Sequence, residues 1–143
     1  MVRALHGRTW SESCLTMADG GRVLSNFTPG PETAAAFRGA LGKFATGVTV
    51  VTCNSSVGPL GITVNSFASL SLDPPLVLWS PARASRRFEA FVAAEHFAIH
   101  VLSSIQHGLS YRFARDGLDF SGLDWTASAR DVPLFDNCLA RFE

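Results

Sequence analysis

A stripe of uncharged polar side chains runs through an otherwise apolar stretch in the middle of the chain. Its members between residues 62 and 72 are Thr63, Asn65, Ser66, Ser69 and Ser71. Hydroxyl and amide groups beside strand backbone suit a neutral, planar heterocycle with polar edges, because they offer both donors and acceptors. The same residue types also fill the solvated outer face of many antiparallel strands, so the stripe alone leaves both interpretations open.

A second polar segment follows closely. Residues 80–87 run Ser-Pro-Ala-Arg-Ala-Ser-Arg-Arg and stand at the start of a predicted helix over 84–93. Free backbone amides at a helix N-terminus, together with a serine and arginines, can hold a phosphate group. The alternative is an ordinary serine N-cap with solvated arginines.

Other chemistries lack their motifs. The sequence has no GxGxxG after a strand, no GxxxxGK[ST] and no GxSxG. No metal site is expected, because the histidines and cysteines lack zinc-ligand spacing, and exposed or hydrogen-bonded histidines and reduced thiols are the preferred interpretation. These residues are His6, His96, His100, His107, Cys14, Cys53 and Cys138.

The elements that position the two polar segments alternate between strands and helices. Helical spacing of Phe37, Leu41 and Phe44 predicts a helix over 32–45, and the β-branched run 48–52 predicts a strand. Residues 54–61 have the composition of a turn, 62–72 of extended chain, and 76–79 of a short strand after the break at 73–75.

The second half of the chain continues this alternation. We expect a strand over 97–102, then a helix capped by Ser103 or Ser104, a loop over 116–132, and a strand starting near residue 139. Together the elements predict a mainly β fold with helices, a small barrel. Residues 1–31 show no periodicity and are predicted to be a flexible N-terminal extension.

Composition narrows the class of protein. The 143 residues suffice for one domain, and 47% hydrophobic with 17% charged residues fits a soluble protein. Twelve basic and twelve acidic residues give a formal net charge of zero, so neither nucleic acid nor an anionic membrane is expected as a partner. No apolar run approaches a membrane span or a secretory signal, so the cytoplasm is the expected location.

Three long segments resemble the flavin reductase family, whose members supply two-component monooxygenases. They are FRGALGKFATGVTVVT at 37–52, GITVNSF at 61–67 and ASLSLDPPLVL at 68–78. Weaker matches follow in 97–102 and at Gln106, Leu109, Phe113 and Ala114, so the resemblance covers about 34–143. It implies an FMN-binding split β-barrel over 32–143 and a homodimer with the flavin near the subunit interface.

The resemblance also implies a role for each polar segment. Thr46 and Val48 would lie near the flavin, and Ser85, with Arg83 or Arg86, would hold its phosphate. The remaining cofactor-binding residues would line the ring and the approach to the phosphate, whereas no catalytic side chain is assigned. They are Thr63, Val64, Asn65, Ser66, Ser69, Leu70, Ser71 and Ser80.

The implied reaction is hydride transfer from NADH or NADPH to N5 of FMN or FAD, after which reduced flavin diffuses to a partner monooxygenase. The family's Gly-Asp-His motif does not occur in this sequence, so we expect the domain to be incomplete at its C-terminal side. Two alternatives are a flavin-binding module without turnover, acting as carrier or sensor, and a related oxidase of a phosphorylated pyridoxine-like substrate. The resemblance leaves FMN against FAD and NADH against NADPH open.

Overall fold

The computed structural model describes residue 28 and residues 30–143, which divide into two units, residues 1–45 and 46–143. In the first unit α1 spans Ala34–Leu41, so the predicted helix over 32–45 is confirmed but shorter. Thr33 is its N-cap, and Thr33 Oγ1 accepts the N–H of the preceding Gly30 at 2.9 Å. The predicted flexible extension falls almost wholly outside the described residues.

A four-stranded antiparallel sheet forms the centre of the second unit. It consists of β1 (Thr49–Ser55), β2 (Gly58–Val64), β5 (Ala98–Val101) and β8 (Ala140–Phe142) in the order β2-β1-β5-β8. The β-branched run in β1 is fully buried between two strands, as its composition predicts. The mainly β fold with helices is therefore confirmed.

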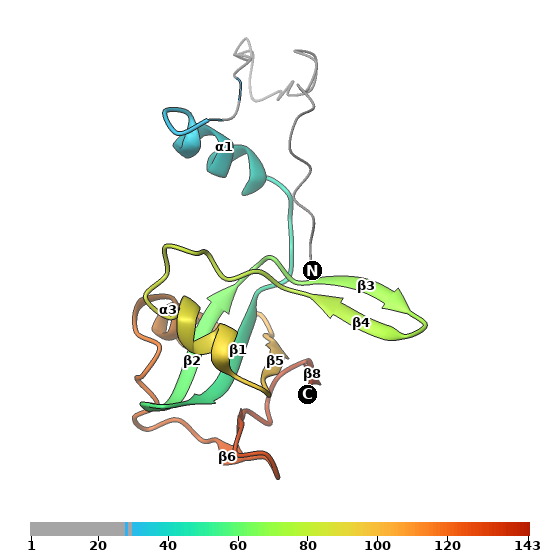
Figure 1. Cartoon of the computed structure of the whole chain (residues 1–143), viewed down its shortest axis with the longest axis vertical. Coiled ribbons are helices and arrows are strands. Elements are labelled where there is room, and N and C mark those ends of the chain that lie inside the picture. Colours follow the sequence, from blue (N-terminus) through green and yellow to red (C-terminus); the bar gives the residue numbers. More distant parts are fainter. Residues whose placement is uncertain (1–27, 29) are drawn as a thin grey trace. The chain divides into compact units, whose positions relative to one another are not determined.

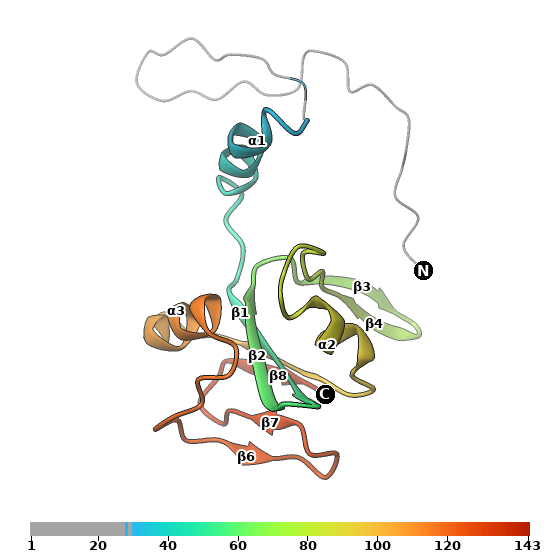
Figure 2. The same cartoon turned by 60° about the vertical axis from the view of Figure 1, so that its left-hand side comes forward.

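Two helices cover opposite faces of this sheet (Figure 2). On one face Phe91 of α2 (Phe88–Ala93) packs against Val51 and Ile99. On the other face Phe113 of α3 (His107–Arg115) packs against Val50. Successive residues of β1 point to opposite faces, so both faces of one strand become core.

Two further hairpins complete the unit. β3 (Ala68–Leu72) pairs with β4 (Pro75–Leu78) and projects from the sheet (Figure 1). The register shifts between Ser69 and Ser71, which makes Leu70 the extra residue of a bulge. β6 (Thr126–Ala127) and β7 (Pro133–Leu134) form the other hairpin.

Several predicted boundaries were wrong. The turn predicted over 54–61 ends early, since β2 begins at Gly58, and the extended segment 62–72 is divided between β2 and β3. The loop predicted over 116–132 contains β6. The third helix is not capped by Ser103 or Ser104: its N-cap is Gln106, whose Oε1 accepts the N–H of Ser103 at 2.9 Å.

Candidate functional site

The polar stripe lies on two elements and the link between them. Thr63 and Val64 end β2, whereas Ser69 to Ser71 belong to β3. In the link, Asn65 and Ser66 are exposed. The stripe is therefore not one face of one strand, and its exposed members gather where β2 passes into the projecting hairpin.

Thr63 and Ser71 of the stripe, and the neighbouring carbonyl of Val64, already have hydrogen-bond partners within the chain. The Thr63 hydroxyl donates to the carbonyl oxygen of Ser110 in α3 at 2.6 Å. The carbonyl of Val64 accepts the Thr49 hydroxyl at 3.0 Å, and Ser71 Oγ accepts the N–H of Asp73 at 3.1 Å. These bonds hold the local backbone; they occupy the donor of Thr63, whereas Ser71 accepts and keeps its O–H for a ligand.

The two polar segments meet at Ser66 and Ser80. Ser66 Oγ accepts the backbone N–H of Ser80 at 3.0 Å and donates to the carbonyl oxygen of Ser80 at 3.2 Å. The hairpin explains this contact, because pairing of Ala68 with Leu78 brings the flanking residues together. The link after β2 and the segment that begins at residue 80 are therefore side by side.

The other predicted residues lie at the surface. Thr46 and Val48 precede β1 and are exposed, with the carbonyl of Val48 accepting the N–H of Leu102 at 3.0 Å. Arg83 and Arg86 are also exposed and make no hydrogen bond or ion pair through their side chains to another described residue. Both guanidinium groups are available to an anion.

The start of α2 differs from the sequence prediction. The helix begins at Phe88, its N-cap is Arg87, and no side chain caps it, so the serine N-cap is wrong. Ser85 Oγ instead accepts the N–H of Arg87 at 3.3 Å, a local turn that competes with helix. A helix of six residues contributes a weak dipole, so a phosphate here would depend on the arginine and serine side chains.

Arg87 holds this segment to the sheet, a role that the sequence did not indicate. Its Nη1 donates to the carbonyl oxygens of Gly61 (3.2 Å) and Phe113, and Nη2 donates to that of Ala114 (3.2 Å). Burial lowers the pKa of Arg87, against an opposing effect of Asp116. No sequence signal could have found this contact, since its acceptors are backbone carbonyls of β2 and of the end of α3.

The backbones of β2 and the chain after α3 touch beside Arg87. The N–H of Gly61 donates to the carbonyl oxygen of Gly117 at 2.8 Å. A Cβ on Gly61 would lie 2.5 Å from Cδ1 of Phe113, and a Cβ on Gly117 would lie 2.7 Å from Cδ of Arg87. Only glycine at these two positions allows helix, strand and arginine to approach so closely.

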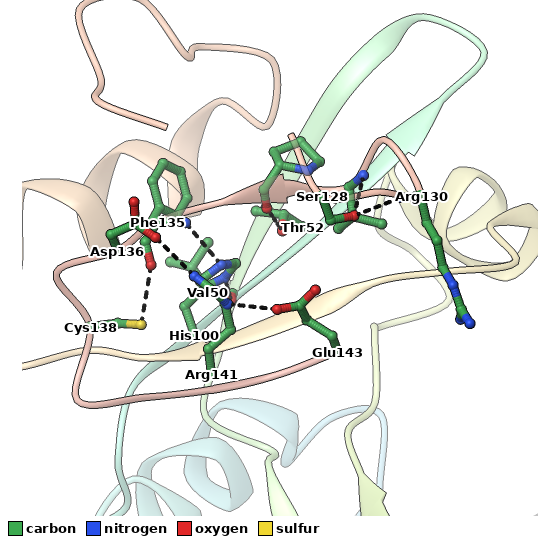
Figure 3. A network of polar contacts seen from close by, with 12 residues as sticks. Val50, Thr52, His100, Ser128, Arg130, Phe135, Asp136, Cys138, Arg141 and Glu143 are labelled. Atoms are coloured by element: carbon green, nitrogen blue, oxygen red, sulfur yellow. Dashed lines mark hydrogen bonds and ion pairs between the residues drawn. The ribbon is translucent and has the colours of Figure 1, made fainter. Parts of the chain in front are cut away.

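His100 is buried in the sheet and is not part of the candidate site (Figure 3). Its Nε2 accepts the N–H of Phe135 at 3.2 Å, so Nδ1 carries the proton and donates to the carbonyl oxygen of Val50 at 3.1 Å. Burial lowers the pKa of His100 to about 4. The interpretation of a hydrogen-bonded structural histidine is confirmed for His100.

The donor set at the junction suits a flavin nucleotide. Exposed hydroxyls and the Asn65 amide offer uncharged donors and acceptors for a heterocycle edge, and the two exposed guanidiniums suit a phosphate. Among the described residues, no group of three His, Cys, Asp or Glu side chains could bind a metal ion. None of the described helices is long and apolar enough to span a bilayer.

Comparison with known proteins gives a consistent result. The model of the flavin reductase like domain matches residues 41–143. The FMN reductase (NADH) SmoA of Agrobacterium fabrum is 60% identical over 117 residues, 82% of this chain and 67% of that protein. The stachydrine N-demethylase reductase subunit Stc3 of Rhizobium meliloti is 46% identical over 110 residues, 76% of this chain and 48% of that protein.

A solved structure extends the likeness to the fold. The NADH:FAD oxidoreductase SgcE6 of Streptomyces globisporus, in complex with NAD and FAD fragments, superposes with a TM-score of 0.71 at 36% identity. The superposition covers 78% of this chain and 68% of that one. The predicted split-barrel fold is thereby confirmed. The chain spans less than half the length of several curated relatives that it matches.

Proposed function

The chain belongs to the flavin reductase family, and from this premise we propose that its protein is an NAD(P)H:flavin oxidoreductase that supplies reduced flavin to a partner monooxygenase. The contact between Ser66 and Ser80 carries the proposal, because it joins the segment suited to the flavin ring and the segment suited to its phosphate. The names of the relatives support the same activity.

We assign the ring to the end of β2, the link after it and the start of the hairpin. Asn65, Ser66 and Ser69 are exposed there and offer an amide and two hydroxyls, with Thr46 and Val48 nearby in the proposed site. Leu70 and Ser71 continue the wall along β3. Ser80, Arg83, Ser85 and Arg86 complete the proposed site at the phosphate.

The protein's contribution is orientation and electrostatics. When bound, the flavin supplies the chemistry, since it accepts a hydride from NADH or NADPH. Uncharged donors at its polar edge stabilise negative charge that develops on reduction, and the arginines neutralise the phosphate. No side chain is assigned as a nucleophile or a general base.

We further propose that the working form is a homodimer in the cytoplasm. The hairpin β3–β4 exposes Leu70 (61%), Leu72 (92%) and Leu76 (46%), an apolar surface that a second copy would cover. The proposed flavin residues adjoin this surface, so a partner subunit there would enclose a ligand. Cys53 and Cys138 are both free thiols, which fits a reducing compartment.

Oxidation of NADH or NADPH by the full-length protein tests the activity. We expect consumption of the nicotinamide cofactor that requires added FMN or FAD and exceeds the rate without protein. Tight flavin binding without turnover would instead support a binding module, and absence of both binding and turnover would overturn the proposal. FMN and FAD tested in parallel, each with NADH and with NADPH, identify the preferred pair.

A further inference from the structure

Both ends of the segment 80–87 are hydrogen-bonded to β2 or to the link that follows β2. At its start, Ser66 Oγ bonds both the N–H and the carbonyl of Ser80. At its end, the Arg87 guanidinium bonds the carbonyl oxygen of Gly61 in β2 at 3.2 Å. The residues between these two ends include Arg83, Ser85 and Arg86, the proposed partners of the flavin phosphate.

We propose that Arg87 is a positioning residue for flavin nucleotides, which sets the place of the phosphate-binding segment relative to the ring-binding residues without touching the ligand. This inference rests on the proposed function. It assigns to Arg87 a selective effect: loss of its bonds shifts residues 83–86 and weakens phosphate binding more than ring binding.

The guanidinium faces the protein and not the proposed ligand. Nη1 bonds two carbonyl oxygens and Nη2 bonds that of Ala114, with a longer contact of 3.5 Å to that of Arg115. These acceptors include the last carbonyls of α3, which a cation stabilises. Because both terminal nitrogens are occupied, Arg87 differs from the exposed Arg83 and Arg86.

The side-chain stem of Arg87 is also confined. Its Cδ lies so close to Gly117 that a Cβ there would be 2.7 Å away, and Gly117 is itself bonded to Gly61. The contacts among β2, the end of α3 and the Arg87 side chain therefore restrict the position of all three. A lysine has one ammonium and cannot reproduce the planar fork that meets several carbonyls at once.

Comparison of FMN with riboflavin isolates the phosphate, because the two molecules share the ring and differ in the phosphate group. We would titrate the full-length wild type, R87M, R87K and R115M with each ligand and follow flavin fluorescence. Arg115 is a matched control, since its side chain is exposed and only its backbone carbonyl meets Arg87.

For R87M we expect the Kd for FMN to rise about tenfold, the equivalent of losing one charge-assisted contact. The Kd for riboflavin should change by less than about twofold, within the uncertainty of such energies. R87K should fall between wild type and R87M, and R115M should match wild type.

Each other outcome has a defined meaning. Equal weakening of FMN and riboflavin in R87M, or no weakening of either, would overturn the positioning role. Failure of the wild type to bind either ligand would instead overturn the proposed function. If R87M does not fold, the ratio of the two Kd values in R87K decides the same question.

Discussion

The N–H of Phe135 donates to Nε2 of His100 across 3.2 Å, and this bond exists only while the imidazole is neutral. The loop after β7 is thereby attached to the centre of the sheet (Figure 3). Protonation of Nε2 would replace an acceptor with a donor that faces the N–H of Phe135. The attachment is therefore sensitive to acid.

We expect the free energy of unfolding to fall as the pH decreases from 6.5 towards 4. The pKa of His100 is lowered by burial from 6.5 to about 4, so between these values the unfolded chain binds a proton that the folded chain does not. Stability is thus retained above pH 6.5, and about 3 kcal/mol is lost by pH 4, at up to about 1.4 kcal/mol per pH unit.

Thermal unfolding from pH 4 to 8 checks this expectation, with H107Q as the control. His107 is exposed, so H107Q should keep the pH dependence of the wild type. H100Q should be less stable at neutral pH and should show a flatter pH profile. An equally steep profile in H100Q would contradict the assignment to His100.

Gly61→Ala should destabilise the domain through the contact between β2 and α3. The added methyl would lie 2.5 Å from Cδ1 and 2.6 Å from Cε1 of Phe113, a ring that is fully buried and cannot move aside freely. Overpacking of this kind costs about 1–3 kcal/mol. Chemical denaturation measures the loss.

Gly108→Ala provides the control, because a Cβ at Gly108 meets nothing within 4 Å, and alanine favours helix by about 1 kcal/mol. The double variant G61A/F113L should recover part of the loss by making room for the methyl group. A G61A protein as stable as the wild type would show that α3 shifts without cost.

The sequence predicted a strand best where residue type and structure agree, as in the run of β-branched residues in β1. It failed at β2, where Pro59 and Gly61 have the composition of a turn. Pro59 is tolerated because β2 lies at an edge of the sheet, and Gly61 is required by Phe113, which no local pattern shows. The start of α2 failed for a similar reason, since Ser85 bonds the backbone of Arg87 in place of capping a helix.

For the candidate site, the sequence showed which polar residue types are present but not which residues their side chains contact. Hydroxyl, amide and guanidinium groups are evident in the sequence, and together with the family resemblance they predicted a flavin nucleotide as the ligand. The bond between Ser66 and Ser80 depends on the hairpin between them. The bonds of Arg87 depend on carbonyl oxygens at the end of α3, which lie 26 to 28 positions further along the chain. Such long-range contacts arise only from the fold.

Polar substitution of the hairpin should shift the proposed dimer towards monomer. Leu70 and Leu72 are mostly exposed in the single chain, so L70S/L72S removes apolar surface without opening the core. We expect a clear decrease in mass by sedimentation or light scattering, with the unfolding of the dissociated monomer little changed. V57S, in another exposed turn, is the control. An unchanged mass in L70S/L72S would contradict the hairpin interface.

Replacement of Arg83 and Arg86 should weaken the binding of FMN selectively and reduce its dependence on salt. Both guanidiniums are exposed and unpaired with any described carboxylate, so R83M/R86M should leave the fold intact. A charge-assisted bond to phosphate contributes about 1.5–3 kcal/mol, so the loss of even one of the two should raise the Kd for FMN at least about tenfold. Riboflavin affinity should stay near that of the wild type.

Titrations at low and high ionic strength measure both effects, because screening weakens exposed charge pairs in the wild type alone. If FMN and riboflavin lost affinity equally, these arginines would not bind the phosphate.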